Sequence, residues 1–477
     1  MEQSADHLAT APVGKLLIRL SIPTIAAQLI NLLYNVVDRI YIGHIPEEGS
    51  LALTGVGVCL PIILIISAFA SLAGTGGAPR ASIFMGKKDP VSAEKTLGNC
   101  FILLIFLSLV LTTVVLIWNR DLLLLFGASE NTIEYSTGYM TIYAAGTVFV
   151  QLTIGLNAFI TAQGFTMVSM RTIIIGAVCN IILDPIFIFL FDMGVQGAAL
   201  ATVISQAISC ISVLHFLFGK KTLLRLKPQY FKLSSKIILP VLALGTSTFV
   251  MQISESVIAI CFNSSLYKYG DDIAVGAMTI LSSVFQFAML PMQGLAQGAQ
   301  PICSYNFGAG NAARVKKTFR LLLISCTAYS FFLWGAVQLF PGLFARLFTN
   351  NAALAAFTTP VLRIYCAALL LFGIQIACQM TFISLGKAFS SVIVAVMRKF
   401  ILLVPLIYIM PALSLFTDKT TAVYAAEPVA DTLSVLFAGT LFTIQFKKAM
   451  QKMETSHSST FDAVKNISAQ DSEKEAR

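Results

Sequence analysis

Long apolar segments separated by short polar loops dominate this chain. Twelve of them are long enough to cross a bilayer as helices, at residues 16–43, 51–79, 95–118, 135–160, 168–191, 196–218, 236–267, 273–302, 317–347, 356–383, 389–413 and 424–446. The first follows a short polar segment and has no small-residue cleavage site, so we expect it to stay in the protein. The pattern predicts an all-α integral membrane protein with twelve transmembrane helices.

The sequence also repeats between its two halves. The segment Pro79–Gly86 resembles Pro301–Gly308, and 301 − 79 = 222. Gly164 and Gly386 have the same spacing, since 386 − 164 = 222. We therefore expect two pseudo-symmetric six-helix lobes of the same topology. Lobes of this kind commonly rock against each other around a central site, so the architecture favours a transporter.

Polar stretches set the predicted boundaries. We expect a cytoplasmic N-terminal segment at 1–14, an N-lobe at 15–219, a basic cytoplasmic connector at 220–236, a C-lobe at 237–448 and a tail at 449–477. The tail is Ser-rich and charged from about Thr455, which favours disorder. Most Lys and Arg residues, with Arg398 and Lys399 counted among them, fall in alternate loops. The positive-inside rule then places the connector and both termini on the cytoplasmic side of a plasma (inner) membrane.

Composition supports a bilayer environment and excludes several classes of protein. Hydrophobic residues make up 57% of the chain and charged residues 12%, and the mean hydropathy is +0.82. A soluble domain carries about twice that charged fraction. The net charge of +9 is spread over loops, so we expect no nucleic-acid partner. The nine cysteines and four histidines lack metal-ligand spacing, and no nucleotide-binding motif occurs, so we expect no metal centre and no cofactor.

Acidic residues inside the first half are the strongest candidates for a site. Asn31, Tyr34, Asn35 and Asp38 lie on one face of the first helix. Asn180 and Asp184 share a face of the fifth helix, next to Pro185, which leaves the Ile181 carbonyl without its usual partner. Charged residues in a membrane are costly and usually functional. We expect Asp38 and Asp184 to lie at one depth and to form an oxygen-rich cluster with Asn180, Asn157 and Thr202, which would hold H+ or Na+. The alternative is that the two acids only join neighbouring helices.

The second half offers weaker candidates. Gln252 and Glu255 lie on one face of the seventh helix, and Glu255 is the one acid that we expect well inside this half. It could bind a coupling ion or a cationic substrate, or it could form a helix contact.

Several segments together resemble the multidrug and toxic compound extrusion (MATE) family. They are LSIPTIAAQLINLLYNVVDRIYIGH, LTGVG, GTGGAPRASIFMGKKD with its counterpart QGAQPICSYNFGAGN, and CNIILDPIFIF with GVQGAALAT, and the likeness spans roughly residues 14–448. The resemblance implies a V-shaped, twelve-helix protein that exports organic cations by antiport with H+ or Na+. It also implies a cation site at Asp38, Asn180, Asp184 and Thr202, as in the prokaryotic branch with N-lobe aspartates. The tenth helix has no acid to pair with Glu255, which argues against a second-lobe ion site of the other branch.

Three functions follow from these observations. The leading one is efflux of cationic amphiphilic small molecules by a protein that is not an enzyme. A flippase for lipid-linked oligosaccharides would need intramembrane cations to hold a pyrophosphate. An intramembrane enzyme would need a nucleophile or base constellation, and the sequence shows none.

Overall fold

A computed structural model describes residues 7–349, 351–413 and 418–475 of this chain, with side chains up to residue 455. The regular elements of the first half are all helices. Its elements are α2 (Val13–Gly43), α3 (Gly49–Gly86), α4 (Pro90–Ile117), the short α5 (Asn119–Leu125), α6 (Ile133–Ala145), α7 (Thr147–Ala162), α8 (Thr166–Pro185), the π-helical η1 (Ile186–Leu190) and α9 (Gly194–Phe218).

The second half repeats this order after a connector that contains the 3-10 turn η2 (Pro228–Tyr230). Its elements are α10 (Ser235–Gly308), α11 (Ala312–Leu339), α12 (Pro341–Phe348), α13 (Ala352–Tyr365), α14 (Leu369–Ser384), α15 (Ala388–Val396), the π-helical η3 (Met397–Leu403), α16 (Val404–Ile409), the 3-10 turn η4 (Met410–Ala412) and α17 (Lys419–Glu475).

The helix count agrees with twelve membrane spans. Among the described residues, nine helices are long and apolar enough to cross a membrane, and two bent pairs, α6 with α7 and α13 with α14, bring the number to eleven. The 74 residues of α10 contain the twelfth, because Asp271 interrupts the helical backbone. A single helix of that length would measure about 110 Å, far beyond the ~30 Å hydrocarbon core of a bilayer. The protein is therefore a multi-pass membrane protein.

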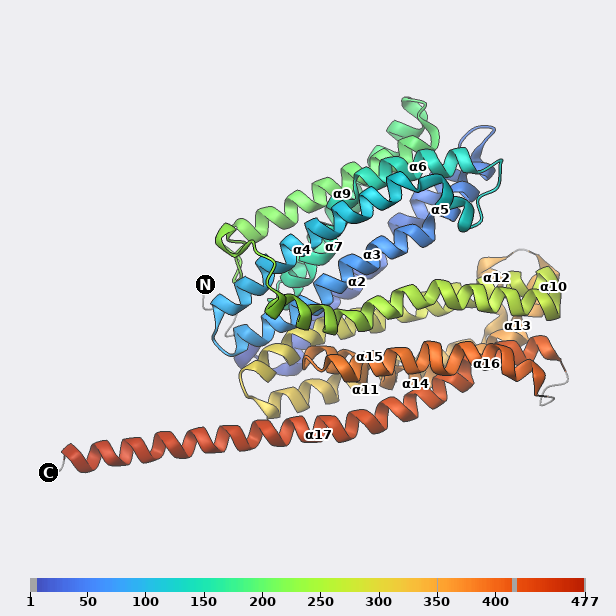
Figure 1. Ribbon diagram of the computed structural model, residues 1–477. Helices are drawn as coiled ribbons and strands as arrows, with labels where there is room; N and C mark the ends of the chain where they lie inside the picture. The colour runs from blue at the N-terminus through green and yellow to red at the C-terminus, as the bar shows by residue number, and fades with distance from the viewer. Residues whose placement is uncertain (1–6, 350, 414–417, 476–477) are drawn as a thin grey trace.

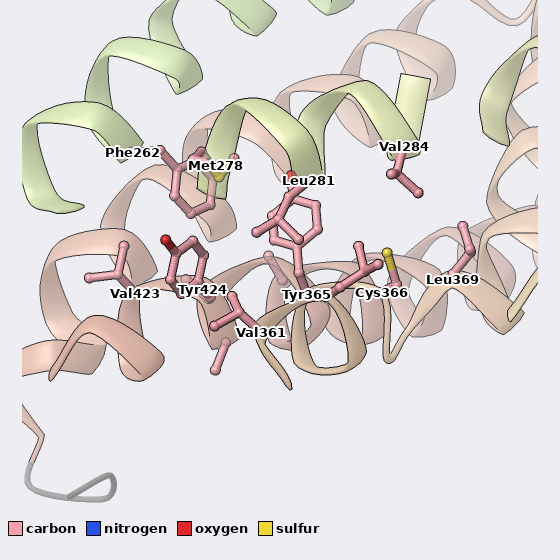
Figure 2. Packing of buried hydrophobic residues seen from close by; sticks show 14 of the residues in the cluster. Phe262, Met278, Leu281, Val284, Val361, Tyr365, Cys366, Leu369, Val423 and Tyr424 are labelled. Carbon is pink, nitrogen blue, oxygen red and sulfur yellow. The ribbon is translucent and has the colours of Figure 1, made fainter. Parts of the chain in front are cut away.

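Figure 1 shows two helical bundles that meet near the N-terminal end of the chain and lie farther apart at their opposite ends. This is the V shape expected from the family resemblance. Each bundle has its own apolar core. In the C-lobe, aromatic and aliphatic side chains such as Phe262, Leu281, Tyr365 and Tyr424 pack between α10, α13 and α17 (Figure 2). A further apolar cluster joins the lobes where they meet, with Leu16 and Leu20 of α2 packed with Ala299 and Ile302 of α10.

The lobes touch through a reciprocal contact between the repeated segments of α3 and α10. Gly86 packs against the Tyr305 carbonyl, and Gly308 packs against the Ile83 carbonyl. The repeat explains this symmetry, because 86 + 222 = 308 and 83 + 222 = 305. A methyl group at either glycine would overlap the opposite backbone, so only glycine allows this approach. Side-chain bonds farther along the same seam join the lobes too, from Thr24 to the Gly294 carbonyl and between Gln28 and Gln297.

The connector lies on the N-lobe. The Gln163 side-chain carbonyl accepts hydrogen bonds from three connector groups, the Thr222 hydroxyl and the backbone amides of Leu223 and Leu224. An ion pair between Lys227 and Glu94, at 2.6 Å, fixes the connector farther on. Residues 1–6 of the N-terminal segment lie outside the described residues.

The tail differs from the prediction of disorder. Its backbone continues α17 as far as Glu475 and projects beyond the bundle (Figure 1). No Gly or Pro occurs after Gly439, so nothing in the sequence ends the helix. The last two residues, 476–477, lie outside the described part.

Candidate functional site

Two helices of the N-lobe bring the predicted acids together. Asp38 lies five residues before the end of α2, and Asp184 lies at the end of α8, where the π-helical η1 begins. The two helices pack against each other. Asp38 is 9% exposed and Asp184 is fully buried. The charge of Asp38 acts on Asp184, so the two carboxylates share one environment.

Asn180 links Asp184 to the neighbouring helix. Its amide nitrogen Nδ2 lies 3.0 Å from Asp184 Oδ1 and 3.4 Å from Thr202 Oγ1 on α9. Asn180 and Asp184 are one turn apart on α8, so the same face of the helix presents both side chains. The structure thus joins Asp184, Asn180 and Thr202 as the sequence pattern anticipated.

Several oxygen atoms of this cluster have no partner. Asp38 Oδ1, Asp184 Oδ2 and Asn180 Oδ1 are buried and accept no hydrogen bond in the described part of the chain. Neither Asp38 nor Asp184 forms an ion pair with a described residue. Buried carboxylates without a counter-charge are unstable. The oxygen atoms therefore suit a proton or a small cation that arrives from outside the chain.

Tyrosine side chains line the same cluster. The Tyr34 hydroxyl, on α2, interacts electrostatically with both carboxylates. Tyr139 and Tyr143 of α6 are buried, their rings stack with centroids 6.1 Å apart, and Tyr139 interacts electrostatically with Asp38. The sequence reading missed these two residues, although their i, i+4 spacing in an apolar helix placed them on one face. They add aromatic surface and hydroxyl groups beside the acids.

The other predicted residues do not contact the two carboxylates. Asn157 donates a hydrogen bond to Thr172 Oγ1 at 3.1 Å. Thr172 lies about two turns before Asn180 on α8, which corresponds to about 12 Å along the helix. Asn31 and Asn35 are exposed, and Asn35 hydrogen-bonds both the Asn31 carbonyl of its own helix and the Tyr34 side chain at the edge of the cluster. Gln252 donates to Ser71 of the N-lobe at 2.9 Å and so belongs to the seam between the lobes. No hydrogen bond of the described residues joins these four side chains to the carboxylates.

The C-lobe contains charges that the sequence reading placed wrongly. The loop pattern of basic residues predicts Arg398 and Lys399 on the cytoplasmic side, but they lie in the π-helical η3 and are 6% and 4% exposed. Arg398 Nη2 lies 2.9 Å from Glu427 Oε1, and Arg398 Nε lies 2.6 Å from Asp431 Oδ1. Both acids are on α17 and both are buried. Pairing with these acids allows Arg398 to stay inside the lobe.

Glu255 belongs to this network and is not the one acid within the second half. Its Oε1 lies 2.8 Å from Lys399 Nζ, while its own side chain is 58% exposed. The signal that could have revealed the network was in the sequence: two adjacent cations in the eleventh apolar segment, and two acids four residues apart in the twelfth. Segments buried in lipid rarely hold such pairs unless they meet.

Comparisons with known proteins agree with the fold. The protein is 26% identical to the multidrug export protein MepA of Staphylococcus haemolyticus over 92% of this chain and 96% of that protein. It is also 26% identical to MepA of Staphylococcus aureus strain NCTC 8325, over 91% and 95% of the two chains.

Solved structures share the whole architecture. A MATE transporter in the bent conformation superposes with a TM-score of 0.88 at 22% identity, covering 94% of this chain and 99% of that chain. An outward-facing multidrug resistance MATE family transporter gives 0.86 at 22% identity, covering 93% and 98%. At this identity the likeness concerns the fold.

A family model identifies the chain. The MatE model matches residues 23–186 and again 247–409, offset by 247 − 23 = 224 and 409 − 186 = 223. The double match confirms the sequence repeat between the halves. Because the model covers more than half of the chain, this protein belongs to the MatE family, the multidrug and toxic compound extrusion family that its sequence resembles.

Proposed function

We propose that this protein is a multidrug efflux transporter that exports cationic small molecules by antiport with H+ or Na+. The relatives named as multidrug export proteins support efflux. The observation that carries the coupling is the pair Asp38 and Asp184, buried close together with unpartnered oxygen atoms. Two such carboxylates resist simultaneous ionisation, so the N-lobe holds an exchangeable positive charge.

Competition for this charge supplies the coupling. An organic cation and the coupling ion cannot both neutralise the same two carboxylates. If the coupling ion binds better in one facing of the lobes and the substrate better in the other, the ion gradient drives export. Asn180 and Thr202 add oxygen ligands for Na+, whereas a proton needs only one carboxylate oxygen.

The basic connector and the lysine-rich loops support a cytoplasmic location for that end of the molecule, in a plasma membrane. The lobes meet at this end and diverge toward the other. In this orientation the described conformation opens outward, the facing from which an exporter releases its cargo.

The buried cations of the C-lobe do not support a flippase function. A pyrophosphate would need free basic groups, but Arg398 and Lys399 are each paired with a carboxylate.

Transport in proteoliposomes tests the proposal. Asp184→Asn and Asp38→Asn should each reduce gradient-driven uptake of a fluorescent organic cation to the passive leak, because the substrate and the coupling ion then no longer compete for a pair of carboxylates. Asp121→Asn changes an exposed acid of α5 and should transport as the unmodified protein does. Imposing pH and sodium gradients separately identifies the coupling ion. Undiminished transport by Asp184→Asn, with the protein still folded, would reject the site.

A further inference from the structure

The charges of the C-lobe network do not balance. Among the described residues, three carboxylates, those of Glu255, Glu427 and Asp431, meet two cations, Arg398 and Lys399. With every group ionised the network carries one surplus negative charge, since 2 − 3 = −1. An unbalanced charge in a buried, low-dielectric region is costly. The pair of Lys399 with the exposed Glu255 is neutral, so the surplus falls on the two buried acids that share Arg398, where a proton or another cation would neutralise it.

The geometry locates the surplus on Glu427. Lys399 serves Glu255, and the single guanidinium of Arg398 is shared between Asp431, through Nε, and Glu427, through Nη2. Glu427 is 2% exposed, and its second oxygen, Oε2, is buried without a hydrogen-bond partner among the described residues. An ionised carboxylate would leave this atom unsatisfied. A protonated one would not.

The backbone around the network is irregular in a way that often marks a functional site. Arg398 and Lys399 lie in a π-helical segment within the fifth helix of the C-lobe. The fifth helix of the N-lobe has a π-helical segment directly after Asp184. Such segments are rare and concentrate at functional sites. Each lobe thus combines one of them with buried carboxylates.

A proton fits this place better than a metal ion. A metal cation needs several oxygen ligands, and the guanidinium of Arg398 and the ammonium of Lys399 would repel it. A proton needs only the free oxygen of Glu427. Among the described residues, no group of three or more acidic, histidine or cysteine side chains is arranged to hold a metal.

The network reaches the space between the lobes. Glu255 is its exposed member, and Gln252, one turn earlier on α10, bonds Ser71 of the opposite lobe. Lys399 connects this exposed carboxylate to the interior, where its charge acts on Glu427. Protons therefore have a route of ionisable groups from the seam to the buried oxygen.

We propose that the Glu427 carboxyl is a second proton-binding site, in the C-lobe, which exchanges protons with the space between the lobes through Glu255 and Lys399. The proton adds to Oε2 and converts the carboxylate to a carboxylic acid, while Arg398 remains paired with Asp431. The ionisable groups that face Glu427 come from four elements: Glu255 on α10, Arg398 and Lys399 on η3, Asp431 on α17 and Tyr365 on α13, with Cys366 directly after it. The site needs no assumption about Asp38 or Asp184.

Infrared difference spectroscopy of the full-length protein in lipid nanodiscs tests this site. The carbonyl band of a protonated carboxyl group should appear near neutral pH and lose one component in Glu427→Gln. Asp431→Asn should lose the same component although Glu427 is still present, because two acids then face two cations and Glu427 becomes ionised. Glu134→Gln, an exposed acid of α6, is the matched control and should leave the band unchanged.

The N-lobe acids provide the second control. The double variant Asp38→Asn with Asp184→Asn should keep the C-lobe component, so failure of the N-lobe coupling site and failure of this site are distinguishable. The proposal is overturned if a folded Glu427→Gln or Asp431→Asn protein keeps the full band, or if the component disappears with the N-lobe pair.

Discussion

The reciprocal glycine contact offers the sharpest test of how the lobes move. In Gly308→Ala, the new methyl carbon would overlap the Ile83 carbonyl, well inside the 3.0 Å that real contacts of this kind respect. The two helices would have to separate by roughly 1 Å, and overpacking of this kind costs about 1–3 kcal/mol. The cost applies only while the lobes touch at the connector end.

The expected result is a shift of conformation rather than unfolding. A penalty of about 1.4 kcal/mol changes the equilibrium tenfold, so the closed connector end should become about ten- to a hundredfold less populated relative to the open one. Gly86→Ala should act in the same way, because the repeat places it in the equivalent contact. Gly439→Ala is the matched control, since no atom of the described residues lies within 4 Å of its added methyl.

Spin labels at Lys87→Cys and Lys317→Cys, one on each lobe, would report this shift. Double electron–electron resonance spectroscopy measures the distance between the two labels. The Gly308→Ala protein should show a longer distance population and slower transport of an organic cation than the Gly439→Ala protein. Identical distance distributions and transport rates in the two variants would contradict the reasoning.

Two further predictions concern the loops at the same end. Gln163→Ala removes the acceptor of three connector hydrogen bonds and should destabilise the attachment of the connector by about 1–3 kcal/mol. The loss should appear as faster proteolytic cleavage after Lys220. Unchanged cleavage would show that the ion pair of Lys227 with Glu94 is sufficient to hold the connector. Asp89 caps α4 through the Ser92 amide at 3.0 Å, and its hydrogen bonds with Ser92 lower the pKa of its carboxyl group. The cap therefore stabilises α4 above the usual aspartate pKa and is lost as the pH falls through the lowered value, so Asp89→Ala should speed hydrogen exchange in the first turn of α4 at neutral pH but not in acid.

The sequence predicted the fold well because every helix that crosses a bilayer must be a long apolar segment. Continuous apolar segments, interrupted at loops, gave all twelve spans to within a few residues at most ends, and the 222-residue spacing gave the two lobes. Family membership confirms the expectation of a transporter rather than an enzyme. What the pattern could not show was where helices bend or lose regular winding, as at the 57° bend between α6 and α7.

The candidate site was only partly predictable, and the reason is the range of the interactions. Asn180 and Asp184 lie four residues apart, so helical spacing alone brought them together. Arg398 pairs with acids 29 and 33 residues away, on a helix that returns from the other side of the bundle. Read one segment at a time, Arg398 resembled a loop residue. The pairing became visible only when the two helices were placed side by side.

The reciprocal contact of Gly86 with Tyr305 and of Gly308 with Ile83 has the form of a two-fold (isologous) interface, in which both partners use the same surface. Two identical half-length chains could assemble through it. Fusion of such a pair into one polypeptide would release each half from the need to match the other away from the axis. One half could then retain aspartates without ion-pair partners while the other acquired basic residues that pair with its acids. The glycine contact between the halves would stay unchanged.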